Sequence, residues 1–385
     1  MNTIDQNTIP APQAKKKKKG KRQFFNSIAM FCNHIVAISI LVSYLAPHVS
    51  PENFWFIALF GLAYPVLVMF NLLFVLYWGL QLKKRAFYSL LIVFAGWFQL
   101  REYVQFNSSE VADKSKNRIK IMSYNVKSFD LYNWNNDTTT RSKMLNLIAD
   151  ESPDIICFQE FYTHNKDSAR NNLNNLVNLQ KAKNTHLEYV ASKGAASWGA
   201  ATFSTYPIVN KGKISFENTN NTCIYSDIDV NGDTIRVYNI HLQSIHFGYG
   251  DYKFVEDIIN NNETEELENS KNILKRLKRA FIKRSTQTEL VSEHIEKSPY
   301  PVIVCGDFND PPASYAYHTI SKNLSDSFIE SGNGFGRTYS GKFPSFRIDY
   351  ILHSNDYKAS DFRTIREKLS DHFPLCCYLH LEKQQ

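Results

Sequence analysis

Side chains capable of chemistry end several apolar runs in the last two-thirds of this 385-residue chain. Each run reads as a short strand and finishes on an amide, a carboxylate or an imidazole. The runs are KIMSYN to Asn125, IICFQE to Glu160, VYNIH to His241, VIVCGDFN to Asp307 and Asn309, and RIDYIL around Asp349, followed by Ser370-Asp371-His372. Apolar side chains would fill a core while the last residue of each run emerges at one rim. This arrangement predicts a catalytic site and therefore an enzyme.

The oxygen atoms in this set favour a hard divalent cation. Carboxylates and side-chain amides suit Mg²⁺ or Mn²⁺, and a Mg²⁺ site commonly combines one or two carboxylates with water and substrate phosphate. His241 and His372 are poor Mg²⁺ ligands, but a protonated imidazole stabilises negative charge near phosphorus. Asp349 could pair with either histidine and keep it charged. Each residue alone could instead cap a turn or satisfy backbone; the whole set at strand ends favours chemistry.

Strict alternation along a strand also predicts which residues of each run share a face with the site residue at its end. Two-residue spacing places Ile156 and Phe158 on the same face as Glu160, and Cys305 on the same face as Asp307.

The front of the chain predicts a membrane region. Phe24–Leu45 and Phe54–Leu80 contain no Asp, Glu, Lys or Arg, and each exceeds the roughly 18 residues that mark a spanning helix. Ala86–Leu100 is shorter and either crosses or lies in the interface. A cleaved signal peptide is the alternative for the first stretch, but no small-residue cleavage site follows it. We therefore expect a disordered basic cytoplasmic tail at 1–22 and two or three transmembrane helices within 23–106.

Flanking charge predicts the orientation of a multi-pass membrane protein. Lys and Arg cluster at 15–22 and 83–85, whereas the loop at 46–53 has neither. The positive-inside rule therefore places the tail and the second turn in the cytoplasm. The remaining chain is extracytoplasmic if the third stretch spans, which we favour, and cytoplasmic if it does not.

The net charge of +7 arises in this front region. Eleven of the 44 basic residues precede residue 107, which leaves 33 basic against 34 acidic residues in the remainder. A domain that binds duplex nucleic acid usually carries a clear basic excess, so the balance counts against a general nucleic-acid binder. The six cysteines include no CxxC pair, which argues against a zinc site or a disulfide framework.

The rest of the chain predicts a polar linker at 107–117 and one α/β domain at 118–385. Helices are expected at 141–149, 166–180 and 285–296, and strands at 200–203, 223–230 and 376–381. Asn231-Gly232 predicts a hairpin turn. The basic helical segment Lys271–Arg284 could grip phosphate or a membrane surface, but a solvated helix face is the interpretation we favour. A loop at 246–252, rich in aromatic residues and glycine, is expected to border the substrate.

An ordered set of motifs resembles the endonuclease/exonuclease/phosphatase superfamily. The motifs are SYN at 123–125, QE at 159–160, HLQS at 241–244, GDFN at 306–309, RIDYIL at 347–352 and SDHFP at 370–374. The resemblance covers nearly all of the chain after residue 118. It implies an α/β (α+β) four-layer αββα sandwich, with two mixed sheets face to face and helices outside, and hydrolysis of phosphoester bonds with a divalent metal.

The resemblance also implies a role for each matched residue. Glu160 resembles the principal metal ligand, with Asn125 and Asp371 nearby. Asp307 would orient and deprotonate the attacking water.

The remaining matched residues would act on the phosphate. Asn309 and His241 would hold non-bridging phosphate oxygens. His372, oriented by Asp349, would stabilise the transition state.

His241 directs the choice of branch. Abasic-site endonucleases lack a histidine at HLQS, so the chain is more similar to the neutral sphingomyelinase, inositol-phosphatase, deadenylase and DNase I-like branches. With the membrane region, this predicts a membrane-anchored, Mg²⁺- or Mn²⁺-dependent phosphodiesterase acting on a phospholipid or sphingolipid head group. The expected partners are the lipid bilayer and the phosphoester, with no obligate protein partner. An endonuclease or exonuclease acting on DNA or RNA, and a catalytically inactive membrane-tethered binding module, are the alternatives.

Overall fold

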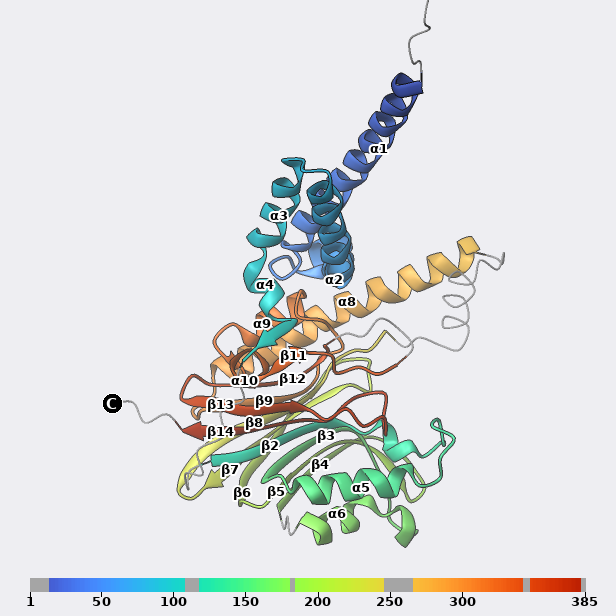
Figure 1. The fold of residues 1–385 in the computed structure, drawn as a ribbon. Helices are drawn as coiled ribbons and strands as arrows, with labels where there is room; N and C mark the ends of the chain where they lie inside the picture. Colours follow the sequence, from blue (N-terminus) through green and yellow to red (C-terminus); the bar gives the residue numbers. More distant parts are fainter. Residues whose placement is uncertain (1–13, 108–117, 181–183, 246–265, 342–346, 382–385) are drawn as a thin grey trace, which may run out of the picture. The chain divides into compact units, whose positions relative to one another are not determined.

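A computed structural model describes residues 14–107, 118–180, 184–245, 266–341 and 347–381. The chain divides into two compact units (Figure 1). The first unit runs to Val42 and includes Ala63–Gly96, and the second comprises Ser43–Leu62 and the chain from Trp97 onward.

The first unit is built from three helices, α1 (Ala14–Ser43), most of α2 (Pro51–Leu80) and α3 (Arg85–Ala95). Among the described residues, the helices long and apolar enough to cross a membrane are Gly20–Ser43 and α2. The third apolar stretch is interrupted at Gly96, after which the short helix α4 (Trp97–Arg101) begins. Whether that stretch crosses a membrane stays a prediction.

The first unit buries several polar side chains and exposes many large apolar ones. Asn33, Asn71 and Ser89 are fully buried, and the Ser89 hydroxyl donates to Asn33 Oδ1 at 3.0 Å. Large apolar side chains such as Phe31 and Leu76 are exposed. Polar groups inside and apolar groups outside are typical of helices packed in lipid.

The disorder predicted for the basic tail is wrong for its second half. Helix α1 begins at Ala14, so residues 14–22 are helical. Alanine, lysine and arginine are good helix formers, and the apolar helix that follows can propagate backwards through them. Residues 1–13 lie outside the described residues.

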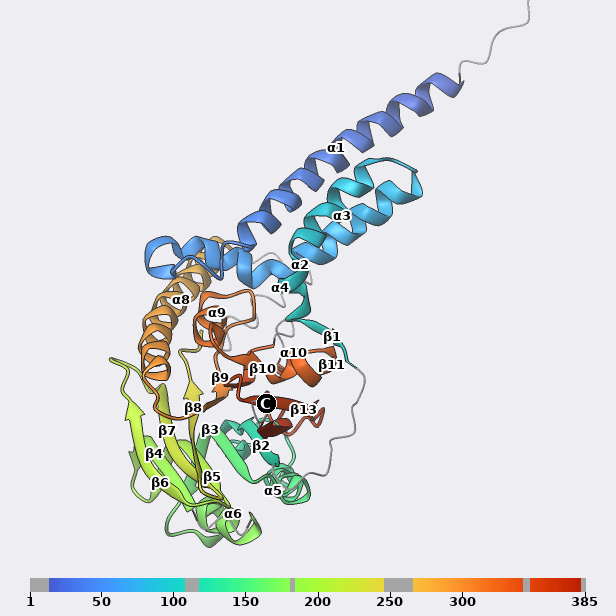
Figure 2. The ribbon, with the colours of Figure 1, turned by 90° about the vertical axis from the view of Figure 1, so that its left-hand side faces the viewer.

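Two mixed six-stranded sheets form the second unit. Their orders are β10-β12-β9-β8-β7-β6 and β13-β14-β2-β3-β5-β4. Within each sheet one pair is parallel, β8 with β9 and β2 with β3. The first sheet consists of β6 (Ile208–Ile214), β7 (Thr222–Val230), β8 (Asp233–His241), β9 (Val302–Asp307), β10 (Ser325–Asp326) and β12 (Asp349–His353). The second consists of β2 (Arg118–Asn125), β3 (Ile155–His164), β4 (Asn184–Lys193), β5 (Ala196–Ser204), β13 (Tyr357–Thr364) and β14 (Leu375–Leu381). A separate short ladder pairs β1 (Val104–Phe106) with β11 (Asn333–Phe335) (Figure 2).

Helices cover the outer faces of the two sheets (Figure 1). They are α5 (Thr140–Glu151), α6 (Asn172–Gln180), α8 (Glu266–Glu296) and α9 (Tyr315–Ser321), with the 3₁₀ turns η1 (Lys127–Asp130) and η2 (Ser168–Arg170). The short helix α10 (Ser327–Ser331) lies instead at the edge of the sandwich, where Phe328 packs in the apolar cluster between the sheets.

Three apolar clusters separate the four layers. One lies between the sheets and contains Cys157 and Cys305. A second joins β2 and β3 to α5 and α6, and a third joins β8, β9 and β12 to α8 and α9. Adjacent residues of β9 alternate between two clusters, because Ile303 belongs to the first and Val304 to the third. Both faces of each sheet are therefore covered, and the predicted four-layer sandwich is confirmed.

Most local predictions agree with the structure. The three predicted strands fall inside β5, β7 and β14, and the helix predicted at 141–149 falls inside α5. Asn231 and Gly232 have φ of +58° and +100°, as the predicted hairpin turn requires. The segments at 271–284 and 285–296 form one helix, α8.

The helix predicted at 166–180 is wrong in its first half. It is divided into η2 and α6. Asp167 accepts the backbone N–H of Ala169, and Asn171 Oδ1 accepts that of Asn174. Such side-chain bonds compete with a continuous helix and start a new one. The linker beyond Asn107 and the loop at 246–252 lie outside the described residues.

Candidate active site

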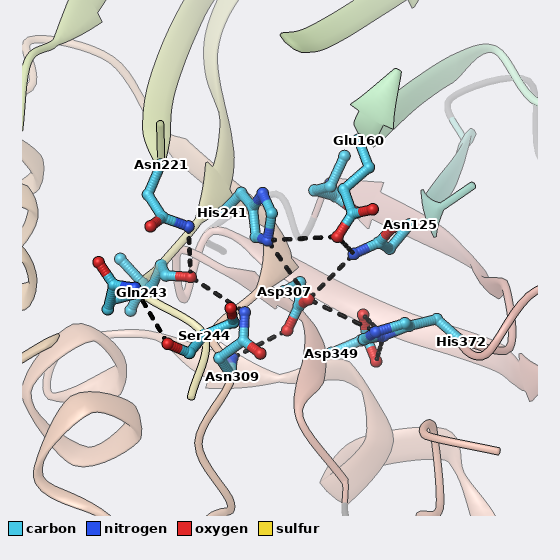
Figure 3. A network of polar contacts seen from close by, with 12 residues as sticks. Asn125, Glu160, Asn221, His241, Gln243, Ser244, Asp307, Asn309, Asp349 and His372 are labelled. Carbon is cyan, nitrogen blue, oxygen red and sulfur yellow. Dashed lines mark hydrogen bonds and ion pairs between the residues drawn. The ribbon is translucent and has the colours of Figure 1, made fainter. Parts of the chain in front are cut away.

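Asp307, at the end of β9, is the centre of a polar network (Figure 3). Its Oδ1 accepts the backbone N–H of Asn309 at 2.8 Å, and its Oδ2 accepts from Asn125 Nδ2 at 3.1 Å. The Nε2 atoms of His372 and His241 lie 3.7 and 3.8 Å from the same Oδ2. One oxygen is thus held by the backbone, while the other faces two imidazoles and an amide.

Strand register brings these groups together. Asp307 has a register partner on each neighbouring strand. These partners are His241 in the parallel β8–β9 pair and Asp349 in the antiparallel β12–β9 pair. Gly306 allows the backbones of β9 and β8 to approach closely, because a Cβ atom at this position would lie 2.0 Å from the Ile240 carbonyl oxygen. The glycine of GDFN is therefore required where β9 meets β8.

His372 and Asp349 form a buried pair. The Nδ1 atom of His372 lies 3.0 Å from both carboxylate oxygens of Asp349. The backbone N–H of Asp349 donates to Thr338 Oγ1, and the ring of Tyr339 packs edge-on against the imidazole. With Nδ1 bound to the carboxylate, Nε2 is the nitrogen that points toward Asp307.

Glu160 reaches the site through a β-bulge, which corrects the alternation prediction. Ile156 and Phe158 pack in the outer cluster beneath α5, not on the site side. The register of β3 with β5 shifts between Phe158 and Phe161, and Glu160 has φ of +51°. The extra residue turns Glu160 Oε1 to within 3.9 Å of His241 Nε2. In β9 alternation holds, since Cys305 lies in the inter-sheet cluster in line with Asp307.

Asp371 has a partner that the sequence did not predict. Its Oδ2 lies 2.7 Å from the Lys127 ammonium. Burial opposes ionisation, but the charges of His372 and Lys127 outweigh it and lower the pKa of Asp371. Burial and the charge of Asp371 raise the pKa of Glu160. The negative charge of Asp371 therefore opposes ionisation of Glu160.

The amides of Asn125 and Asn309 are also engaged. Besides Asp307, Asn125 Nδ2 donates to Glu160 Oε1 at 3.5 Å, and its Oδ1 accepts the backbone N–H of Lys127. Asn309 has φ of +53° and donates from Nδ2 to the Leu242 carbonyl. Asn125 thus presents its N–H groups, not its oxygen, to the centre of the site.

The two groups in the buried half of the site have shifted pKa values. Burial raises the pKa of Asp307 to about 6, and Asp349 adds to this while both imidazoles oppose it. Burial lowers the pKa of His372, but the charges of Asp349 and Asp307 outweigh burial and raise it well above its usual range. Near neutral pH Asp307 is largely ionised and His372 is protonated.

Two groups of residues could hold a cation. Within the described residues, Asp307, Asp349 and His372 place one ligand atom each within 4.8 Å of one another. Asp349 and His372 already bind each other there, and imidazole suits Mg²⁺ poorly. At the other side, Glu160 has a 40% exposed side chain and a pKa that the nearby Asp371 charge raises. A cation would relieve that repulsion, so the carboxylates on this side fit a hard divalent ion.

A cavity of about 560 Å³ opens beside Glu160 and His241. The described residues that line it include Trp198, Asn218, Thr219, Asn221, Gln243 and Ser244, together with Arg276, Arg279 and Lys283 from α8. Glu160 is the only acidic residue among the described lining residues.

The structure brings the predicted site residues together, but the strand-end position predicted for Glu160 is wrong, because β3 continues past it to His164. Sequence reasoning missed Lys127, and it favoured a solvated helix face for the basic segment of α8, three residues of which line the cavity. It also missed the bond from Gln159 Nε2 to Asn239 Oδ1 that ties the two sheets at 2.8 Å behind the site. Gln159 is next to Glu160, and Asn239 lies two residues before His241. A polar residue within an otherwise apolar strand was therefore the sequence signal that could have indicated this bond.

Comparisons with known proteins identify the family and support the fold. Residues 122–372 match the model of the endonuclease/exonuclease/phosphatase family, and residues 25–103 match a domain of unknown function. No curated protein matches. A solved family structure from Bacteroides vulgatus has 18% identity and a TM-score of 0.51, covering 69% of this chain and 100% of its own.

Two further solved structures are similar. One from Beutenbergia cavernae has 17% identity and a TM-score of 0.49, covering 69% of this chain and 72% of that one. One from Bacteroides thetaiotaomicron has 18% identity and a TM-score of 0.48, covering 69% and 98%. At these identities the Bacteroides vulgatus structure supports the fold alone.

The family match spans well over half of the chain and coincides with the sandwich and its polar centre. Members of this family hydrolyse phosphoester bonds and generally depend on divalent metals. The chain therefore belongs to the endonuclease/exonuclease/phosphatase family of phosphoester hydrolases.

Proposed function

We propose that the second unit hydrolyses a phosphodiester in a phospholipid or sphingolipid head group, by attack of water and with Mg²⁺ or Mn²⁺. The observation that carries the hydrolytic step is the environment of Asp307. This buried carboxylate has one oxygen fixed by the backbone, and its other oxygen faces two imidazoles.

Asp307 acts as the general base. Its Oδ2 takes a proton from a water molecule as the water oxygen attacks phosphorus and the bond to the leaving oxygen breaks. A pKa of about 6 is low enough for the carboxylate to be ionised at neutral pH and high enough to accept a proton. The backbone bond to Oδ1 keeps Oδ2 directed at the water.

The two histidines act on the phosphate. Protonated His372, held by Asp349, directs Nε2–H at the charge that develops in the transition state. His241 binds a non-bridging oxygen. Asn309 uses one of its two Nδ2 hydrogens on Leu242 and keeps the other for phosphate.

Glu160 is the principal residue of the cation site, with Asp371 and Asn125 beside it. When bound, the cation would polarise the phosphate and the leaving oxygen. Asn125 would contribute its Oδ1 atom to the cation. This atom now accepts the backbone N–H of Lys127, and the cation would replace that contact. Asp371 would share its carboxylate with Lys127.

The first unit supports a substrate in a membrane. Two of its helices are long and apolar enough to cross one, and polar groups are buried between helices that expose apolar side chains. The near-neutral charge of the remaining chain also disfavours a long polyanion.

We further propose that the catalytic sandwich lies on the extracytoplasmic side, the side of the loop between α1 and α2. The start of α2 belongs to the second unit. Glu52 accepts the Thr286 hydroxyl at 2.5 Å, and the Lys278 ammonium lies 5.4 Å from the Trp55 ring centre. Residues that touch α8 must lie on the same side of a membrane as α8. Protease digestion of right-side-out and inverted vesicles would test this, with cleavage of the sandwich expected only in the former.

The test of hydrolysis uses the full chain in detergent micelles. We expect Mg²⁺-dependent turnover of bis(p-nitrophenyl) phosphate, which Asp307→Ala lowers about 10³-fold and Glu160→Ala abolishes. Head-group release from phosphatidylcholine, phosphatidylglycerol and sphingomyelin is then compared with nicking of plasmid DNA. Head-group release without nicking supports the lipid proposal, and nicking without release overturns it. Absence of turnover by the wild type with Mg²⁺ and Mn²⁺ would overturn the hydrolytic proposal itself.

A further inference from the structure

The basic segment of α8 forms one wall of the cavity beside the catalytic centre. Arg276, Arg279 and Lys283 are spaced three and four residues apart, so they share one face of the helix. All three line the cavity that Glu160 and His241 also line. The basic segment was predicted to form a solvated helix face, but the face that carries these three residues lines the cavity beside the site.

Buried contacts fix this wall in place. The guanidinium of Arg284 is nearly fully buried and donates to the Gln243 carbonyl at 2.8 Å and to Asp310 Oδ1 at 2.9 Å. The Gln287 side-chain oxygen accepts the backbone N–H of Gln243. Gln243 follows His241 by two residues, so α8 is joined directly to the segment that follows β8, the strand that ends at a catalytic histidine.

Lys283 connects this wall to a second segment that lines the cavity. Its ammonium donates to the Asn218 carbonyl at 2.8 Å. Asn218 begins the segment 218–222, whose side chains line the same cavity. Asn221 Nδ2 donates in turn to the Leu242 carbonyl at 2.8 Å, close to His241 (Figure 3).

The described lining of the cavity carries more positive than negative charge. Among its described lining residues, three carry a positive charge and only Glu160 carries a negative one. A cation at Glu160 would remove that single negative charge. The amides and hydroxyls at 218–222 and 243–244 add hydrogen-bond donors. Such a wall is suited to an anion with several oxygen atoms.

We propose that this wall binds a second phosphate group of the substrate, separate from the one that is hydrolysed. The proposal rests on the proposed phosphodiesterase activity and names its substrate class, a membrane phosphoester whose polar part carries two phosphates. A lipid is favoured over a nucleic acid strand because a different face of α8 contacts Trp55, which lies within the apolar stretch Phe54–Leu80 of α2.

Soluble probes test the second anion directly. Fructose 1,6-bisphosphate and fructose 6-phosphate are titrated by calorimetry into the full chain in micelles with excess Mg²⁺. We expect the bisphosphate to bind about tenfold more tightly, the effect of one additional charge-assisted contact. Arg279→Gln should remove most of this difference. Lys275→Gln is the matched control, because Lys275 is exposed on α8, carries the same charge and does not line the cavity.

Turnover then identifies the source of the second phosphate. With cardiolipin, which has two phosphates, Arg279→Gln should raise KM about tenfold, and with phosphatidylglycerol or bis(p-nitrophenyl) phosphate it should change KM less than about twofold. Equal binding of the two sugar phosphates, or equal effects of Arg279→Gln and Lys275→Gln, would overturn the second-phosphate site. A KM effect confined to an oligothymidylate would replace the lipid with a nucleic acid strand. Because the calorimetry requires no turnover, this site can fail while hydrolysis stands, and the reverse.

Discussion

The two sides of the catalytic cleft are built differently. On one side, the side chains of Asp307, Asp349 and His372 are each at most 7% exposed and are linked through short contacts. On the other side, Glu160 has a 40% exposed side chain and stands at an open cavity with a basic wall. The buried side is arranged before substrate arrives, whereas the open side has room for groups that come from solution.

This difference separates two tasks. Proton transfer needs fixed distances and shifted pKa values, which burial and paired charges provide. Cation and substrate binding need exposed oxygen atoms and accessible charge. Changes on the buried side should therefore lower kcat, and changes on the open side should alter the metal requirement or KM.

The largest loss of activity is expected on the buried side, from Asp307→Ala. Removing the proposed base should lower kcat about 10³-fold while KM changes little, because general-base catalysis contributes on this scale. Steady-state kinetics with bis(p-nitrophenyl) phosphate measure both constants. An unchanged kcat would show that Asp307 is not the base.

On the open side, Glu160→Gln should act through the cation. The amide loses the negative charge, so the Mg²⁺ concentration for half-maximal activity should rise about a hundredfold, with activity partly recovered at high Mg²⁺. Mg²⁺ titrations of the variant and the wild type provide the measurement. A fall in kcat that saturating Mg²⁺ leaves untouched would instead place Glu160 in the proton-transfer step.

Within the buried side, Asp349→Asn tests the partner of His372. The amide cannot hold the imidazole in its charged form, so the pKa of His372 should fall and kcat should drop about a hundredfold. The alkaline limb of the pH–rate profile should move to lower pH. The profile would stay in place if Asp349 served only to pack β12.

The pH–rate profile of the wild type should reflect the shifted pKa values of both Asp307 and His372. Protonation of Asp307 removes the base, so the rate should fall as pH decreases through about 6. His372 must remain protonated, and its raised pKa puts the alkaline limb above the usual histidine range. Bound Mg²⁺ would move the acid limb downward. A profile with an alkaline limb near pH 6.5 would contradict the His372–Asp349 pair.

Much of the buried side could be predicted from the sequence. Uninterrupted apolar runs predicted the strands, and Asp307 and His241 each follow such a run, so their strand-end positions were readable. Parallel pairing of β8 with β9 then makes them neighbours. The position of Gly306 before Asp307 is likewise explained by close backbone contact.

The open side was predicted less well, for physical reasons. Alternation put Glu160 on the wrong face, because a bulge shifts the pairing by one residue and no residue type in IICFQE marks it. The contact between Lys127 and Asp371 joins residues 244 positions apart. Helix period predicted which residues of α8 share a face, but not that the face borders a cavity, since that depends on the buried bonds of Arg284.

The smallest effect is expected from Lys127→Met, which tests whether the open side is tuned by an internal cation. The Lys127 ammonium occupies Asp371 Oδ2 at 2.7 Å, where it competes with a metal ion for that carboxylate. Removing it should lower the half-activating Mg²⁺ concentration about threefold, within the range of a partly exposed ion pair. Asp371→Asn in the same background should reverse the gain, because the released carboxylate is then absent. If Lys127→Met weakened Mg²⁺ activation, the ammonium would be holding Asp371 in place for the cation, and the competition between them would be rejected.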